Sequence, residues 1–337
     1  MEVVPGIHQL KLPLPVPTTQ LADVNAYLIE GKRDWLLVDT GWNTRQTFAE
    51  LEKQLKEIGV SFESISQIII THFHPDHYGL AGKLKELSGA RIALHQIEQG
   101  FIDSRYINMD TLLAETADQL RLHGVPDDEL PRLQRASLEL RKYVSPISAE
   151  ITLHGGERIA HGPFNFEVVW TPGHSPGHIC LYEPRRKVLL SGDHLLPTIF
   201  PNVGLHPQSG ENPLGDYLHS LRVVEELDID LVLPAHEYVF SSFKQRIKEI
   251  YRHHDARKAA IIDVLKEGPK TAYEVSCRIP WIVNGATMSF TELPPLDKRL
   301  AVMSALAHLE PLCGEGKAQK FRRDGTLLYG AVGVDKS

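Results

Sequence analysis

The side chains best suited to chemistry stand within six consecutive positions of this 337-residue chain: His72, His74, Asp76 and His77. Residues two apart in an extended segment point the same way, so His72 and His74 can face one point. Asp76 and His77 follow Pro75 and turn toward a neighbouring point. Imidazole nitrogens and carboxylate oxygens bind divalent metals, so this segment can supply two metal ions that lie close together. A histidine-rich surface loop, or buried structural histidines, is the alternative interpretation.

The surrounding residues predict the elements that position this segment. Ile68–Ile70 is typical of a buried strand, and Leu80 and Leu84 after it have helical spacing. The candidate ligands therefore lie on a strand-to-helix loop. Further strands are expected upstream at 24–29 and 35–38, followed by a helix that ends at Gly59. This alternation of strands and helices indicates an α/β fold.

The pattern His-x-His-x-Asp-His of residues 72–77 resembles the signature of the metallo-β-lactamase fold hydrolases. Three later segments resemble the family's other ligand loops: 171–178 with His174, 191–194 with Asp193 and 233–236 with His236. Asp39, at the end of an expected strand, resembles the aspartate that supports the metal loop from behind. The resemblance extends over about residues 1–250 and implies an αββα sandwich, in which two sheets lie between outer helices.

Carried over position by position, the resemblance implies two metal sites and a bridging ligand. The first site consists of His72, His74 and His174, the second of Asp76, His77 and His236, and Asp193 bridges them. Two divalent ions are expected, with zinc as the first choice and iron or manganese as alternatives. Two such ions lower the pKa of a shared water from nearly 16 to about 7, so hydroxide is available at neutral pH. Asp76 is the expected catalytic residue, moving the proton of this water to the leaving group.

Other residues near these motifs are weaker candidates. His178 and His194 stand close enough to the ligands to support them, or only to support their loops. His206 is on a long segment that could line a substrate cleft. Tyr27 and Tyr238 could donate a hydrogen bond to an oxyanion, although core packing is the commoner role of such tyrosines.

Composition narrows the class of protein. The apolar fraction of 42% and the charged fraction of 23% are ordinary for a globular protein, and no apolar run approaches the roughly 18 residues of a membrane span. The first residues do not resemble a signal peptide, so we expect a cytoplasmic protein that does not bind membranes. The three cysteines are widely spaced, which argues against a disulfide framework or a thiolate metal site.

Residues 96–145 form an expected helical insertion between the first and second ligand motifs, with an apolar stripe at Leu133, Ala136, Leu140 and Val144. An insertion at this place is well situated to cover the metal site. On that hypothesis, deletion of residues 100–143 should change Michaelis constants more than metal content. A homodimer interface and plain core packing are the competing interpretations.

The expected metal hydrolase domain ends near residue 250, and residues 251–337 differ in character. Three helices followed by a hairpin around Asp324–Gly325 are predicted, an arrangement that resembles a winged helix. This segment has 13 Lys and Arg against 10 Asp and Glu, whereas residues 1–250 have 23 against 33. A winged-helix-like extension occurs in some members of the superfamily, including an endoribonuclease branch.

Three functions remain open at this point. The motifs resemble the hydroxyacylglutathione hydrolase and lactonase branch, which implies hydrolysis of a small thioester, ester or lactone, with a small acyl compound as the partner. An endoribonuclease is the second interpretation, although the C-terminal excess of positive charge is small for nucleic-acid binding. An iron-dependent persulfide dioxygenase is the third, since it keeps much of the ligand set. Flavodiiron proteins are disfavoured, because they have a glutamate where this chain has His74.

Overall fold

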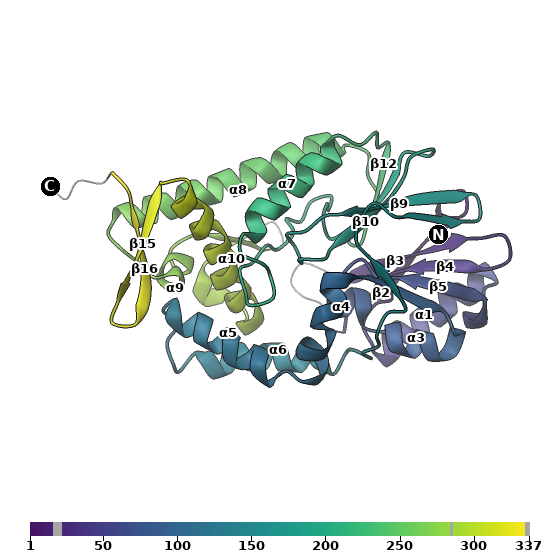
Figure 1. The fold of residues 1–337 in the computed structure, drawn as a ribbon, viewed down its shortest axis with the longest axis horizontal. Coiled ribbons are helices and arrows are strands. Elements are labelled where there is room, and N and C mark those ends of the chain that lie inside the picture. Colours follow the sequence, from purple (N-terminus) through teal and green to yellow (C-terminus); the bar gives the residue numbers. More distant parts are fainter. Residues whose placement is uncertain (16–21, 284–285, 334–337) are drawn as a thin grey trace.

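The computed structural model describes residues 1–15, 22–283 and 286–333. Two β-sheets packed face to face form one end of it (Figure 1). The first sheet has seven strands, in the spatial order β1 (Glu2–Val4), β2 (Ile7–Pro13), β3 (Asp23–Glu30), β4 (Trp35–Val38), β5 (Ile65–Ile69), β6 (Arg91–His95) and β7 (Ile151–Leu153). The second sheet has five strands, in the order β12 (Leu231–Pro234), β11 (Val188–Gly192), β10 (Ile179–Glu183), β9 (Phe164–Trp170) and β8 (Arg158–His161). Buried side chains of both sheets, such as Ile29, Ile69, Phe166 and Leu181, fill the space between them.

Helices cover the outer face of each sheet. On the first sheet, α1 (Arg45–Ile58) and α3 (Ala81–Ser88) bury Leu51, Leu55 and Leu84 in one hydrophobic cluster. On the second sheet, α7 (Pro213–Glu225) and α8 (Phe243–Lys266) bury a corresponding set of apolar side chains. The predicted αββα sandwich is therefore confirmed. The predicted end of α1 is also confirmed, since Gly59 caps it in the left-handed conformation (φ 83°).

Strand direction brings the candidate ligand loops to one edge. Strands β4, β5, β6 and β7 are parallel neighbours in the first sheet. In the second sheet β11 and β12 are parallel, and β9 runs the same way because both it and β11 pair antiparallel with β10. The segments that follow β5, β9, β11 and β12 therefore leave their sheets at carboxyl ends, where side chains from distant parts of the chain can meet.

The predicted insertion is helical, as expected from its sequence. It consists of α4 (Gln96–Ile102), a π-helical segment Asp103–Ile107, α5 (Asp110–Leu122) and α6 (Leu130–Arg141). Of the predicted stripe, Leu133 and Val144 are buried and Leu140 is half-buried, while the side chain of Ala136 lies outside the described residues. Leu120 and Leu133 pack in a cluster with residues of the C-terminal segment, such as Val302 and Leu306. The insertion therefore shares a hydrophobic core with the end of the chain.

The C-terminal segment contains the predicted helices and hairpin. After α8 come α9 (Ala272–Ser276), the strand pair β13 (Trp281–Val283) and β14 (Ala286–Met288), α10 (Pro295–Gly314) and the hairpin of β15 (Ala318–Arg323) and β16 (Thr326–Ala331). Asp324 and Gly325 both have positive φ, as the predicted tight turn requires. The strands β13 and β14 were not predicted. The likeness to a winged helix and the division at residue 250 stay predictions, and α8 runs unbroken through that position.

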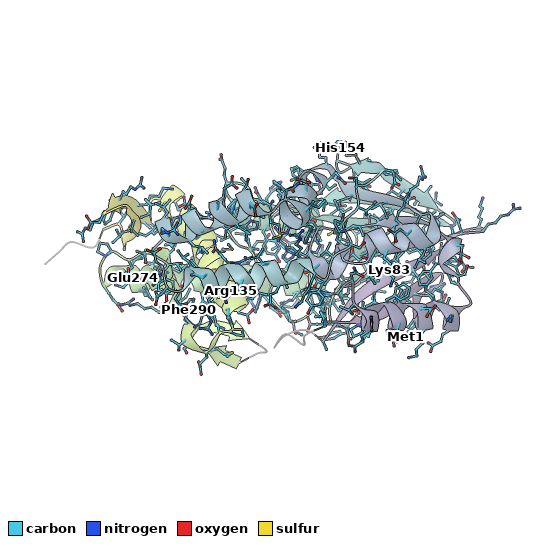
Figure 2. The ribbon with its side chains drawn as sticks, turned by 90° about the horizontal axis from the view of Figure 1, so that it is seen from below. Met1, Lys83, Arg135, His154, Glu274 and Phe290 are labelled. Atoms are coloured by element: carbon cyan, nitrogen blue, oxygen red, sulfur yellow. The ribbon has the colours of Figure 1, made fainter. Side chains whose placement is uncertain are left out.

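The shape is elongated, with the sandwich at one end and the β15–β16 hairpin at the other (Figure 1). Figure 2 shows the same from another side: Met1 and Lys83 lie toward one end, Glu274 and Phe290 toward the other, and Arg135 of α6 lies between. Among the described residues, no helix has the length and apolarity needed to cross a bilayer.

Candidate metal centre

The loop after β5 is held in place by Asp39, which follows β4. Both the backbone N–H and the hydroxyl of Thr71 donate to the Asp39 carboxylate, at 2.8 and 2.9 Å, and His77 Nδ1 donates to it at 2.8 Å. Pro75 then begins the short helix α2 (Pro75–Tyr78), since its fixed φ suits the first helical position. After this change from extended to helical backbone, the His77 ring lies beside the His72 ring, with 4.0 Å between the ring centres. The predicted supporting role of Asp39 is therefore confirmed.

The first predicted ligand set converges on one point. His72 Nε2 lies 2.9 Å from His74 Nδ1, and His74 Nδ1 lies 3.0 Å from His174 Nε2. These three nitrogens come from two loops 100 residues apart in the sequence. His72 is fully buried, whereas His74 and His174 are half-buried, so the point is open on one side.

The second set converges beside the first. His236 Nε2 lies 3.4 Å from Asp76 Oδ2, and His77 Nε2 lies 3.7 Å from the same oxygen. Asp193 stands between the sets: its Oδ1 is 3.5 Å from His77 Nε2 and 3.3 Å from His236 Nε2, and its Oδ2 is 3.4 Å from His174 Nε2. All seven predicted residues therefore come together. One carboxylate oxygen of Asp193 faces each set, as a bridging ligand requires.

The second nitrogen of several rings is held by a partner outside the cluster. His236 Nδ1 donates to the carbonyl oxygen of Asp23 at 2.9 Å, and His174 Nδ1 donates to that of Asn202 at 2.8 Å. A carbonyl oxygen can only accept, so each Nε2 is left unprotonated and faces the centre when the ring is neutral. His178 acts similarly on Asp193, because its Nε2 accepts from the Asp193 backbone N–H at 3.1 Å. Of the two roles considered for His178, this bond to a backbone N–H shows support of the loop.

Protonation preferences differ between the two sets. Burial and the nearby imidazoles keep the pKa of His72 and of His74 well below the ordinary value, so both rings are neutral. Burial also lowers the pKa of His236, but the carboxylates of Asp193 and Asp76 outweigh it and raise that pKa to about 10. The carboxylates therefore make this buried position favourable for positive charge.

Buried polar atoms without hydrogen-bond partners indicate that a metal cation could supply this positive charge. Among the described residues, His77 Nε2, His236 Nε2 and Asp193 Oδ1 are buried and have no hydrogen-bond partner. Leaving such atoms unsatisfied costs about 1–3 kcal/mol each, and a cation between them would satisfy all three. Three residue groups have ligand atoms within 4.8 Å of one another: His72, His74 and His174; His72, His77 and Asp193; and Asp76, His77 and His236. The cluster therefore fits divalent metal ions, whose identity this donor set leaves open.

Sequence reasoning missed Glu98, a buried carboxylate in α4 that connects two ligand loops. One oxygen accepts from the backbone N–H of Phe73 at 2.8 Å, and the other accepts from Ser175 Oγ at 2.9 Å and the Gly177 N–H at 2.6 Å. Burial raises the pKa of Glu98 to about 7 despite these donors. No motif marks this glutamate, because its partners are brought to it only by the fold.

The weaker candidates have different outcomes. The Tyr27 hydroxyl donates to the Pro234 carbonyl at 2.7 Å, so its hydrogen is not available to an oxyanion. Tyr238 is 55% exposed. Neither ring nitrogen of buried His194 has a hydrogen-bond partner among the described residues. His206 is half-buried, and its pKa falls to about 3 through burial and the charges of nearby arginines and His174.

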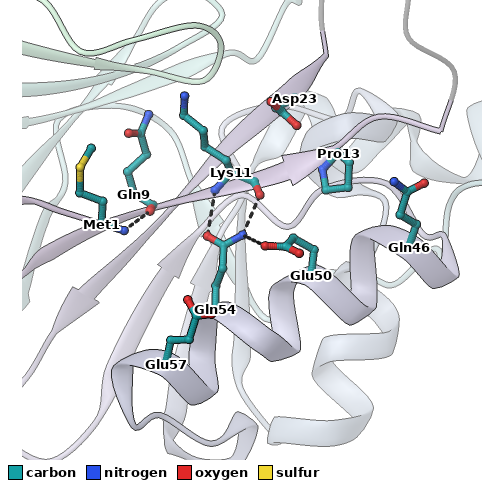
Figure 3. A pocket seen from close by; sticks show the side chains of 9 residues that line it. All are labelled: Met1, Gln9, Lys11, Pro13, Asp23, Gln46, Glu50, Gln54 and Glu57. Carbon is teal, nitrogen blue, oxygen red and sulfur yellow. Dashed lines mark hydrogen bonds between the residues drawn. The ribbon is translucent and has the colours of Figure 1, made fainter.

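A separate surface hollow lies between β2 and α1 (Figure 3). In it the Gln54 side-chain amide donates to Lys11 O at 2.7 Å and to Glu50 Oε1 at 2.9 Å. Asp23 also lines this hollow. Its backbone oxygen accepts the hydrogen bond from His236 Nδ1 described above. None of the seven cluster residues lines the hollow, so it is distinct from the candidate centre.

Comparison with known proteins agrees with this geometry. Residues 20–236 match the family model described as "Metallo-beta-lactamase superfamily". The chain is 29% identical over 324 residues to "Probable metallo-hydrolase YqjP" of Bacillus subtilis, covering 93% of this chain and 95% of that protein. A metallo-beta-lactamase family protein from Thermus thermophilus superposes with a TM-score of 0.83 at 33% identity, covering 98% of this chain and 100% of the other.

A beta-lactamase domain protein from Burkholderia ambifaria superposes with a TM-score of 0.77 at 28% identity, covering 98% of this chain and 94% of the other. Both structural matches extend through the C-terminal segment, so the shared architecture is more than the sandwich. The names of these relatives do not favour an endoribonuclease or a persulfide dioxygenase. The chain belongs to the metallo-β-lactamase superfamily and is a metallo-hydrolase with its α/β sandwich fold.

Proposed function

We propose that this metallo-hydrolase cleaves a small thioester, ester or lactone with water activated at a two-metal centre. The observation that supports this most strongly is the convergence of two ligand sets on either side of Asp193, whose two oxygens face opposite sets. Buried nitrogen and oxygen atoms without partners at the same place favour bound cations.

Interatomic distances support the proposed assignment of ligands. One ion would be held by His72 Nε2, His74 Nδ1 and His174 Nε2, the other by Asp76 Oδ2, His77 Nε2 and His236 Nε2, and the Asp193 carboxylate would be shared between them. Five imidazoles and two carboxylates without a thiolate suit zinc, and iron or manganese are the alternatives. When bound, two such ions would lower the pKa of a water between them to about 7 and polarise the substrate carbonyl.

Asp76 is the protein group proposed to transfer the proton, and no side chain described beside it is suited to be the nucleophile. The half-buried Asp76 lies at the edge of the second set, where its carboxylate can accept the proton of the attacking water and return it to the leaving group. Neighbouring side chains are poorly suited to act as the nucleophile. Ser175 Oγ donates to Glu98, and burial raises the pKa of the Cys180 thiol to about 12. Water is therefore the nucleophile in this proposal.

The test combines metal analysis with a substrate panel. The purified full chain should contain two equivalents of metal, and should hydrolyse members of a panel of thioesters, esters and lactones faster than phosphodiesters or RNA. Asp76→Asn should lower kcat by about 10²–10⁴-fold, because it removes the proton acceptor. The exposed Asp263 provides the matched control, since Asp263→Asn should leave kcat unchanged.

Three results would contradict the proposal. The first is a folded protein that retains fewer than one metal ion per chain after incubation with excess metal. The second is turnover of RNA with no turnover of acyl substrates. The third is oxygen uptake on a persulfide, which would identify a dioxygenase.

A further inference from the structure

Two arginines from separate parts of the chain lie near the loop that follows the Asp193 motif. Arg105 belongs to the π-helical segment of the insertion, and its guanidinium carbon lies 4.1 Å from the centre of the Phe73 ring. Phe73 stands between the ligand-type residues His72 and His74, so Arg105 is adjacent to the first ligand set. Arg299 comes from α10 in the C-terminal segment.

The loop after the Asp193 motif connects these arginines to the centre. Its Asn202 carbonyl accepts from His174 Nδ1 at 2.8 Å, and its Leu205 N–H donates to the Met303 carbonyl of α10 at 2.9 Å. Further along, Gln208 Oε1 accepts from Arg105 at 2.8 Å. The His174 loop, α10 and the insertion are therefore tied together around one loop. His206 lies on it, and the charges of Arg105 and Arg299 both act on its ring.

Neither arginine has a carboxylate partner within ion-pair distance in the described parts of the chain. The partners of Arg105 are neutral groups, namely Gln208, the Phe73 ring and the Tyr106 hydroxyl. Among the described residues, the Nε of Arg299 is buried and has no hydrogen-bond partner. Burial, with the charge of Arg105, lowers the pKa of Arg299 to about 10. Glu98 is close enough for Arg105 to act on its pKa, but its two oxygens already accept three hydrogen bonds.

Such an arrangement opposes stability. Two guanidinium groups that remain charged repel each other, and a buried charge without a partner is costly. If the two arginines only filled space in the core, a leucine or methionine could do the same without the free-energy cost of a buried charge. An anion between the two groups would remove it, because guanidinium donors match the oxygens of carboxylate and phosphate groups.

We propose that Arg105 and Arg299, with His206 beside them, bind an anionic carboxylate or phosphate group on the substrate, at a distance from the bond that is cleaved. This inference rests on the proposed function and narrows its substrate class to acyl compounds that carry a negative group. The insertion and the C-terminal segment each supply one arginine. Substrate selection therefore comes from the two parts added to the sandwich.

Calorimetry of the metal-loaded full chain tests the proposal without any turnover. Succinate, glutarate and adipate are each compared with the monocarboxylate of equal chain length: butyrate, valerate and hexanoate. Both members of a pair can bind the metals through one carboxylate. The ratio of their dissociation constants therefore measures how much the second carboxylate adds to binding. At least one dicarboxylate should bind about tenfold more tightly than its partner, as expected for charge-assisted hydrogen bonds.

Arg105→Gln and Arg299→Gln should each abolish this preference, and Arg105→Lys should retain part of it, because it keeps the charge. Arg132→Gln on the exposed face of α6 is the matched control and should keep the wild-type ratio. Compounds with one carboxylate replaced by a phosphonate distinguish phosphate from carboxylate recognition. Metal content and melting temperature of each variant should equal or exceed those of the wild type, which separates lost binding from misfolding.

Steady-state kinetics supplies a second readout. With esters that do and do not carry a terminal carboxylate, the two Arg→Gln variants should raise KM for the anionic ester by about tenfold or more and leave the neutral ester unaffected. Equal binding of all matched pairs by the wild type, or a preference that survives both substitutions, would overturn the anionic subsite. Absence of turnover with every ester would instead count against the proposed function, while the calorimetric ratio would still decide the subsite.

Discussion

At the scale of single residues, orientation of the ligand-type histidines depends on partners that are not ligands themselves. Asp39 accepts from His77 Nδ1 and from both donors of Thr71, while backbone carbonyls hold His174 and His236. The three hydrogen bonds from ring nitrogens fix which nitrogen of each imidazole faces the centre. Loss of such a partner should therefore weaken metal binding even though every ligand remains.

Asp39→Asn should lower metal affinity or activity by about 10–100-fold, because the amide cannot accept from all three donors. A chelator competition titration measures the affinity. Asp263→Asn, at an exposed position of α8, should show wild-type affinity. Unchanged affinity in the Asp39 variant would mean that the loop after β5 keeps its geometry without this carboxylate.

Glu98→Gln should lower kcat/KM by about 10–100-fold, because one oxygen that accepts from the ligand loops becomes a donor. It should also lower the free energy of unfolding by about 1–3 kcal/mol, as expected when buried donors lose their acceptor. Denaturant unfolding and steady-state kinetics measure the two effects. Glu115→Gln on the exposed face of α5 is the control, and an equal effect there would refute a specific role for Glu98.

At the scale of elements, helices α8 and α10 meet through two buried histidines. His254 Nδ1 donates to His308 Nε2 at 3.0 Å, and His308 Nδ1 donates to the Ser304 carbonyl at 2.7 Å. Burial lowers the pKa of His308 to about 3 and holds that of His254 well below the ordinary value, with the charge of His308 contributing. Both rings are therefore neutral in the folded protein.

This pair predicts a loss of stability in mild acid. In the unfolded chain both histidines titrate near 6.5, so below that pH the unfolded state binds more protons and is favoured. The stability contributed by the two neutral rings is therefore fully present above pH 6.5 and is lost as pH falls. For His308 the loss continues to about pH 3, by up to about 1.4 kcal/mol per pH unit, and His254 acts in the same direction. His308→Gln should flatten this dependence in unfolding measured between pH 7 and pH 5. His219→Gln, at an exposed position of α7, should retain the wild-type slope, and identical slopes for both variants would contradict the prediction.

At the scale of the whole molecule, the insertion and the C-terminal segment behave as one addition to the sandwich. Leu120 and Leu133 of the insertion are fully buried against Val302 and Leu306 of α10. α8 extends from the second sheet toward the end that carries the β15–β16 hairpin (Figure 1). The deletion of residues 100–143 considered from the sequence would therefore remove part of a core, so substitutions such as Arg105→Gln separate the functions of the insertion more cleanly.

A chain truncated after residue 250 should not fold as an independent domain with an intact insertion. The cut falls within α8 and exposes the leucines of α5 and α6, each worth about 1.5–3 kcal/mol when buried. Limited proteolysis should cleave the fragment within residues 96–145, where the full chain is resistant. A fragment with native protease resistance and full metal content would support the division at residue 250.

Local sequence patterns determined much of this protein. The strand before the first ligand loop, the turn at Pro75, the cap at Gly59 and the hairpin turn at Asp324 all depend on neighbouring residues, so local patterns predicted them. The seven cluster residues were identified by resemblance, and the fold brings all of them together. The helical nature of the insertion followed from the same short-range periodicity.

Only the tertiary structure decided which distant groups meet. Glu98 and Ser175 are 77 positions apart, and Arg105 and Gln208 are 103 apart, with no pattern in either segment that names its partner. The shared core of the insertion and α10 was equally hidden, because an apolar stripe shows that a face is buried but not what covers it. The spacing of residue types in the sequence predicts structure only over a few neighbouring residues. These long-range contacts depend instead on how the two sheets, the insertion and the C-terminal segment pack together.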